Sequence, residues 1–129
     1  MTRLVAAKFL NNVRVLVKDG CEDDYLKAVE AWATPDGMSE RYLAKTGERR
    51  YCFVGLWESE GKLISARPFM IEHLNSVRGF LDELSPELGV TDPVSGPIVV
   101  HSSWFQAQQI ILLFLLHDWN NHSWLQTKQ

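Results

Sequence analysis

The sequence has only two cysteines, Cys21 and Cys52, and their spacing matches no metal-binding or redox motif. We therefore expect two free thiols, as is usual in a reducing cytoplasm. The longest aliphatic run, residues 110–116, is much shorter than the roughly 20 residues that span a bilayer. The N-terminal residues lack the apolar stretch and cleavage site of a signal peptide. These absences predict a cytoplasmic protein without a membrane partner.

An excess of positive charge is also missing, because 13 basic residues face 16 acidic ones and the net charge is -3. This balance gives no electrostatic footprint for nucleic acid. The sequence contains no glycine-rich phosphate loop, no nucleophile elbow and no HExxH motif. We therefore set aside nucleotide binding, serine hydrolase activity and zinc protease activity. His101, His117 and His122 lack the tight spacing of a metal site. We therefore expect neither a metal nor a cofactor.

The first half of the chain alternates in a way that predicts a strand, a helix and a hairpin. Residues 9–17 form a strand in which the odd-numbered positions, Asn11 included, make the more apolar face. Acidic residues at 22–24 open a short helix that stops before Pro35 and Gly37. Residues 39–46 and 50–58 predict two antiparallel strands, and the second is apolar on both faces.

The second half predicts a long helix and a last strand. Apolar residues recur at helical spacing from Leu63 to Leu84, and Pro68 is expected to separate a short first turn, residues 61–67, from a new helix. Residues 91–100 predict a strand that Pro93 and Pro97 confine to a sheet edge or a bulge. The resulting order, βαββαβ, is the ferredoxin-like α+β pattern.

The chain therefore divides into a domain over residues 1–100 and a C-terminal extension over residues 101–129. The extension holds three of the five tryptophans and almost no charge, so it does not have the composition of a disordered segment. Two interpretations stay open for it. One is a helix from about Trp104 to Trp119 that packs on the domain or on a second subunit, and the other is a read-through tail unrelated to the domain.

The sequence from 53 to 63, FVGLWESEGKL, resembles the antibiotic biosynthesis monooxygenase family of dimeric α+β barrels. In these sequences a strand that ends in Trp-Glu-Ser opens the second helix, and the segments ARPFM at 66–70 and GVTDPVSGP at 89–97 are similar too. The resemblance covers nearly all of residues 8–100, but its motifs are structural rather than catalytic. It implies a homodimer whose sheets pack face to face, with a pocket between each subunit's own sheet and helices.

The activity that the resemblance implies is a monooxygenase that works without cofactor on a small aromatic or enolisable substrate. Asn12 would orient a substrate oxygen or dioxygen, His73 would act as acid or base, and Arg67 would stabilise an enolate-like oxygen. The apolar wall of the substrate site would come from four side chains: Tyr51, Phe53, Trp57 and Met70.

Each of these residues also has a plain structural interpretation. The aromatics are ordinary strand residues of a buried sheet, Asn12 is an edge amide, His73 is a helix-flank histidine and Arg67 pairs with a nearby acid. The alternative function is a non-catalytic dimeric module that binds a small ligand. Haem degradation would need a tryptophan on the second helix together with Asn12 and His73, and the equivalent position holds Ser65.

Overall fold

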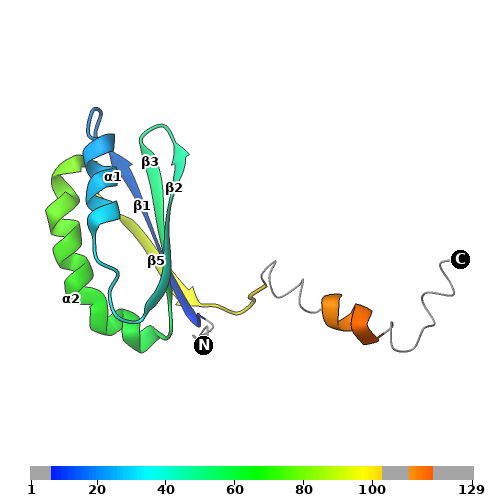
Figure 1. Ribbon diagram of the computed structural model, residues 1–129. Coiled ribbons are helices and arrows are strands. Elements are labelled where there is room, and N and C mark those ends of the chain that lie inside the picture. The colour runs from blue at the N-terminus through cyan, green and yellow to red at the C-terminus, as the bar shows by residue number, and fades with distance from the viewer. Residues whose placement is uncertain (1–6, 103–110, 118–129) are drawn as a thin grey trace, which may run out of the picture. The chain divides into compact units, whose positions relative to one another are not determined.

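The computed structural model describes residues 7–102 and 111–117. Its centre is an antiparallel sheet in which β1 (Phe9–Val17) lies between β3 (Arg50–Trp57) on one side and two short strands on the other. The short strands are β4 (Leu81–Asp82) and β5 (Asp92–Pro97), and β2 (Met38–Gly47) pairs with β3 at the opposite edge. Figure 1 shows both long helices on one face of this sheet.

The element order confirms the predicted ferredoxin-like α+β fold. Strand β1 leads through α1 (Glu22–Ala31) to the β2–β3 hairpin, and α2 (Glu60–Val77) returns the chain to the β1 edge. The one addition is β4, a two-residue strand that was not expected. The sheet is open within one chain, so a closed barrel would require a second copy.

Helix α2 is continuous through Pro68, which corrects the expected break at this residue. Ser59 caps its first turn by accepting a hydrogen bond from the Lys62 backbone N–H at 3.2 Å. Pro68 removes the hydrogen bond that would reach the carbonyl of Ile64 one turn earlier. Both residues lie on the exposed side of the helix, so water can satisfy that carbonyl and the helix continues.

The same helix ends at Val77, seven residues before the predicted end at Leu84. Residues Arg78–Phe80 form one 3-10 turn, and Leu81 then pairs with Val17 as part of β4. Leu81 is only 3% exposed, so the apolar pattern correctly indicated a buried residue. It belongs to a strand, however, and not to the helix. Glycine is a poor helix former, so Gly79 favours an end of the helix at this point. The apolar spacing of α2 nevertheless continues across it into β4.

Strand β5 is an edge strand, as its prolines predicted. It pairs antiparallel with β1, and Pro93 and Pro97 stand opposite Val13 and Phe9. Arg14 reaches across to Asp92 in an ion pair that joins the two strands.

The buried side chains form two clusters rather than one. The first surrounds Val17, Tyr25 and Leu81, and it joins β1 and β3 to α1 and to the end of α2. The second surrounds Trp57, which is fully buried, together with Phe9 and Leu63 near the start of α2. The helices therefore hold the sheet at two places.

Trp57 satisfies its buried indole N–H by donating to the Asn11 side-chain oxygen at 2.7 Å. The bond passes close to Gly55, which pairs with Asn11 across the two strands. A Cβ at position 55 would lie 2.5 Å from Asn11 Oδ1 and 3.1 Å from Trp57 Nε1. Glycine is therefore required here by the close approach of the two polar groups.

The face of the sheet opposite the helices carries a partly exposed apolar surface. Leu10, Val54 and Leu56 point to this side because they occupy the alternate positions of β1 and β3. Asn12 belongs to the same face. We call this surface the outer face.

The chain divides into two compact units, Met1–Ile98 and Val99–Gln129. In the second unit, residues 111–117 are helical, and the rest of the helix expected from Trp104 to Trp119 lies outside the described residues. No helix among the described residues is long and apolar enough to cross a membrane.

We expect Gly55→Ala to lower the free energy of unfolding by about 1–3 kcal/mol, because the new methyl group would overpack the contact between Asn11 and Trp57. Urea denaturation measures this change. Gly79→Ala is the control, since a Cβ on that exposed glycine meets nothing within 4 Å and the residue is not part of the outer face. Equal stabilities for the two variants would contradict the packing argument.

Candidate functional site

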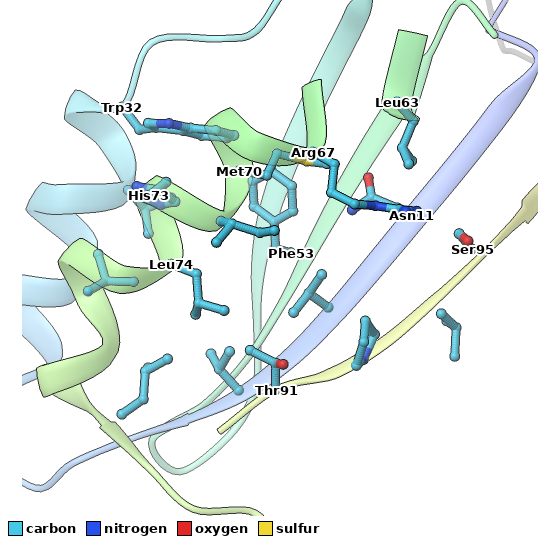
Figure 2. Close-up of a pocket in the computed structure, with 18 of the residues that line it drawn as sticks. Asn11, Trp32, Phe53, Leu63, Arg67, Met70, His73, Leu74, Thr91 and Ser95 are labelled. Atoms are coloured by element: carbon cyan, nitrogen blue, oxygen red, sulfur yellow. The ribbon is translucent and has the colours of Figure 1, made fainter. Parts of the chain in front are cut away.

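A pocket of about 490 Å³ lies between the helices and the inner face of the sheet, within the size range of small-molecule sites. It occupies the space between the two core clusters, and its walls include Val15 and Val77 from the first and Leu63 from the second. Figure 2 shows its lining side chains, with Trp32 and His73 toward one end and Asn11, Arg67 and Ser95 toward the other. The pocket thus has an aromatic end and a polar end.

The aromatic end is built on His73, which projects from α2. Its ring stacks on Trp32, the residue that follows α1, with 4.4 Å between ring centroids and 16° between planes. Phe53 from β3 meets Trp32 edge-on at 6.1 Å. His73 is half-buried, and neither of its ring nitrogens bonds to another residue in the part of the chain that the structure describes. An imidazole held in this way is free to exchange a proton with a ligand.

The surroundings of His73 favour its neutral form. Burial lowers the pKa of His73 from its usual value near 6.5, and the nearby positive charge of Arg41 lowers it further. Arg41 extends from β2 with its guanidinium carbon 5.4 Å from the centre of the Trp32 ring. At neutral pH the imidazole is therefore unprotonated and can accept a proton.

The polar end is formed by Arg67, Asn11 and Ser95, from α2, β1 and β5. The Arg67 side chain extends from the helix toward the sheet in Figure 2. The Asn11 oxygen accepts from Trp57, and an indole N–H can only donate, so the amide NH₂ of Asn11 is the group left for other partners. This end therefore offers hydrogen-bond donors.

Four of the predicted site residues line the pocket together: Phe53, Arg67, Met70 and His73. Tyr51 and Trp57 are instead buried in the two core clusters. Tyr51 donates its hydroxyl proton to Glu22, which also pairs with Lys45 at 3.0 Å, so it holds α1 to the sheet.

Asn12 does not line the pocket. It points to the outer face, where its side-chain oxygen accepts a hydrogen bond from the Cys52 thiol at 3.2 Å. Its neighbour Asn11 occupies the pocket side. The alternation of β1 already grouped Asn11 with Val13 and Val15, and this was the signal that could have selected it.

Trp32 is another residue that the sequence did not identify as part of the site. It lies beyond the end of α1 and stacks on a histidine of α2. A local pattern cannot predict this contact.

The donor set does not match a metal site or the haem constellation. No group of three potential metal ligands occurs among the described residues. Helix α2 has no tryptophan, and Ser65 occupies the position where haem degradation would require one. The stacked Trp32 comes from a different element.

No known family model matches the sequence, and no curated protein does. Solved structures match about three quarters of the chain. A dimeric ferredoxin-like protein from an uncultured marine organism is 13% identical with a TM-score of 0.58, covering 76% of this chain and 93% of its own. The chain has a ferredoxin-like fold.

Other structures with this ferredoxin-like fold are named for oxygenase chemistry. A candidate antibiotic biosynthesis monooxygenase from Nitrosomonas europaea is 9% identical with a TM-score of 0.60, covering 79% of this chain and 100% of its own. SnoaB, a cofactor-independent oxygenase from Streptomyces nogalater, is 13% identical with a TM-score of 0.50, covering 77% and 98%. The resemblance to the monooxygenase family therefore holds at the level of the fold.

We expect acid to destabilise the protein through His73. Its pKa is lower in the folded chain than in the unfolded chain, so the unfolded chain binds the proton more readily. The contribution of the neutral ring is complete above about pH 6.5 and is lost as the pH falls through the lower folded pKa. Urea denaturation between about pH 7 and pH 5 should show a smaller loss of stability in His73→Gln than in the wild type.

His101→Gln serves as the control, because His101 is exposed and lies in the second unit. This variant should lose as much stability as the wild type over the same range. A His73→Gln variant with the wild-type pH dependence would contradict the assignment.

Proposed function

We propose that the protein is a cofactor-independent monooxygenase that acts on a small aromatic or enolisable substrate in this pocket. The observation that carries the proposal is the position of His73, an uncharged imidazole with unbonded ring nitrogens on the wall of an otherwise largely apolar pocket. The likeness of the fold to SnoaB supports the same reaction class. Because SnoaB is only 13% identical to this chain, the proposed reaction is argued from the pocket.

The reaction requires a substrate carbon whose C–H bond is acidified by a conjugated oxygen. The base removes this proton, and the resulting carbanion gives its electrons to dioxygen and forms a C–O bond. The peroxide then loses water and leaves a carbonyl group. The net change, CH₂ plus O₂ to C=O plus H₂O, balances with dioxygen as the only oxidant.

The pocket supplies the functions that this chemistry needs. His73 accepts the proton, because its ring is uncharged at neutral pH and its nitrogens are not bonded to other described residues. Arg67 and the Asn11 amide donate to the substrate oxygen that gains negative charge. Trp32, Phe53 and Met70 hold the aromatic body and keep water from the carbanion.

A non-catalytic ligand-binding module is the second candidate. It would be favoured by a pocket lined only with hydrocarbon and a histidine that points to solvent. His73 instead lines the pocket, and Arg67 lines it as well. These polar groups support the catalytic proposal over the binding module.

We expect the protein to accelerate oxygen uptake by anthrone, measured with an oxygen electrode. His73→Gln should lower kcat by about 100-fold, because it removes the proton acceptor while keeping a polar side chain of similar length. His101→Gln should keep the wild-type rate. An oxygen uptake no faster than without protein, for anthrone and for model quinols, would contradict the proposal.

Variants of the two adjacent asparagines test whether the pocket or the outer face carries the reaction, because Asn11 and Asn12 point to opposite sides of the sheet. Asn11→Asp keeps an oxygen for Trp57 but replaces the pocket donor by a second acceptor, so oxygen uptake should fall by about 10-fold or more. Asn12→Ala should change it by less than about 2-fold, because Asn12 bonds to Cys52 on the other side of the sheet. The reverse result would transfer the catalytic role to the outer face and to Asn12.

We also propose that the protein is a homodimer in which two outer faces pack against each other. Leu10, Val54 and Leu56 supply an apolar surface on this face, and a matching structure is described as dimeric. Sheet-to-sheet packing of two copies would complete the α+β barrel.

Sedimentation equilibrium at micromolar concentration should give twice the chain mass of 14.8 kDa. Leu56→Arg should shift it to the monomer, because the charge would be buried between the faces. Leu88→Arg, at an exposed residue beyond α2, should leave the dimer intact. A wild-type monomer would contradict the dimer.

A further inference from the structure

The pocket has an unbalanced set of charges. No aspartate or glutamate is among the described residues that line it, and Arg67 is the one permanent cation among them. His73, the other titratable base there, is held in its neutral form by its surroundings. A ligand that entered with a positive charge would meet Arg67 and no compensating group, so the electrostatics oppose cations and favour anions.

Arg67 is not engaged by the protein itself. It makes no hydrogen bond or ion pair with any residue in the described part of the chain, unlike Arg14 and Arg49, which pair with Asp92 and Asp82. Its guanidinium is the group with the largest capacity to bind a planar anion, and it extends from α2 toward the sheet. The partner of this group therefore has to come from the solvent or from a ligand.

Asn11 adds a second donor at the same end of the pocket. Its oxygen is committed to Trp57 at 2.7 Å, which orients the amide so that the NH₂ group is on the remaining side. Among the described residues, Nη1 of Arg41 is the only fully buried side-chain nitrogen or oxygen that lacks a hydrogen-bond partner. The Asn11 NH₂ group is not in that class, so it is accessible. Because Asn11 lines the pocket, this donor is available to a ligand.

We infer that the pocket binds its ligand as a planar aromatic anion, with the charge on an enol or phenol oxygen that lies between Arg67 and the Asn11 amide. The substrate class is therefore an acidic hydroxyaromatic or enol that is already ionised at this oxygen when it binds and that still carries the C–H bond whose proton His73 removes. A neutral ketone can accept a hydrogen bond from Arg67, but it does not balance the charge of the guanidinium. This inference rests on the proposed function for the choice of an enol or phenol oxygen, whereas the preference for an anion follows from the pocket alone.

The aromatic end fits the rest of such a molecule. Trp32 and His73 form a stacked pair, Phe53 closes the side, and aliphatic side chains of β1 and α2 separate them from the polar end. A two-ring or three-ring compound placed here puts its ionised oxygen at Arg67 and a ring carbon toward His73. The volume of about 490 Å³ accommodates a molecule of this size.

The test compares two dyes that differ in one methyl group. 2-Hydroxy-1,4-naphthoquinone is an enolate at neutral pH, and 2-methoxy-1,4-naphthoquinone is its uncharged methyl ether. Calorimetric titration should show the enolate binding about 10-fold more tightly or better, the range expected for one charge-assisted hydrogen-bond pair in a partly exposed site. Arg67→Met should abolish the preference, because it should weaken binding of the enolate far more than binding of the ether.

Three further measurements complete the experiment. Arg78→Met, which removes an arginine outside the pocket lining, should keep the preference. Asn11→Asp should weaken binding of the enolate more than binding of the ether. 2-Naphthoate tests a carboxylate in place of the enolate and should bind less tightly than the enolate.

Equal binding of the enolate and the ether, a preference that survives Arg67→Met, or no binding of either dye at millimolar concentration would overturn the inference. Tighter binding of 2-naphthoate would overturn the assignment to an enol or phenol. Neither dye has to react with oxygen. A protein that binds the enolate but never consumes oxygen would therefore refute the proposed reaction and leave this inference intact, whereas oxygen uptake by anthrone without anion preference would do the opposite.

Discussion

The hydrogen bond between Trp57 and Asn11 determines both how this fold packs and what its pocket presents. The tryptophan is completely buried, and its indole N–H must find an acceptor in the interior. Asn11 provides that acceptor from the neighbouring strand, and Gly55 leaves room for the contact. Because the indole can only donate, it dictates which end of the amide faces the pocket. One packing requirement thus sets the polarity of one end of the pocket.

The position of the helices has two consequences for function. Both cover the same face of the sheet, and they contact it through two separate apolar clusters. The space between the clusters is the pocket, and most of its walls are side chains of the helices and strands themselves. The same one-sided arrangement leaves Leu10, Val54 and Leu56 on the opposite face without cover from the helices.

Much of this fold could be predicted from the sequence, because its strands and first helix have clear local periodicity. Strand β1 has the predicted bounds, and β5 is at the edge where Pro93 and Pro97 exclude a central position. The end of α2 could not be predicted in this way. Leu81 lies four residues after Val77, and that spacing suits a continuing helix as well as the strand that the chain forms.

The site was less predictable than the fold, for two different reasons. The choice between Asn11 and Asn12 depends only on which face of β1 is covered, and the alternation of the strand contained that information. The family resemblance directed attention to Asn12 instead. Trp32 and His73, by contrast, lie on elements separated by the whole β2–β3 hairpin, and only the three-dimensional packing of α1 beside α2 brings their rings together.

The prolines of β5 also control how the sheet can grow. The Ile98 N–H donates to the Lys8 carbonyl, so by the antiparallel pattern residues 93, 95 and 97 turn their backbone groups away from β1. Pro93 and Pro97 have no N–H to offer there, which leaves Ser95 as the one outward donor between them. Such a rim is a poor template for an additional strand, and it protects the protein from the edge-to-edge aggregation to which open sheets are prone.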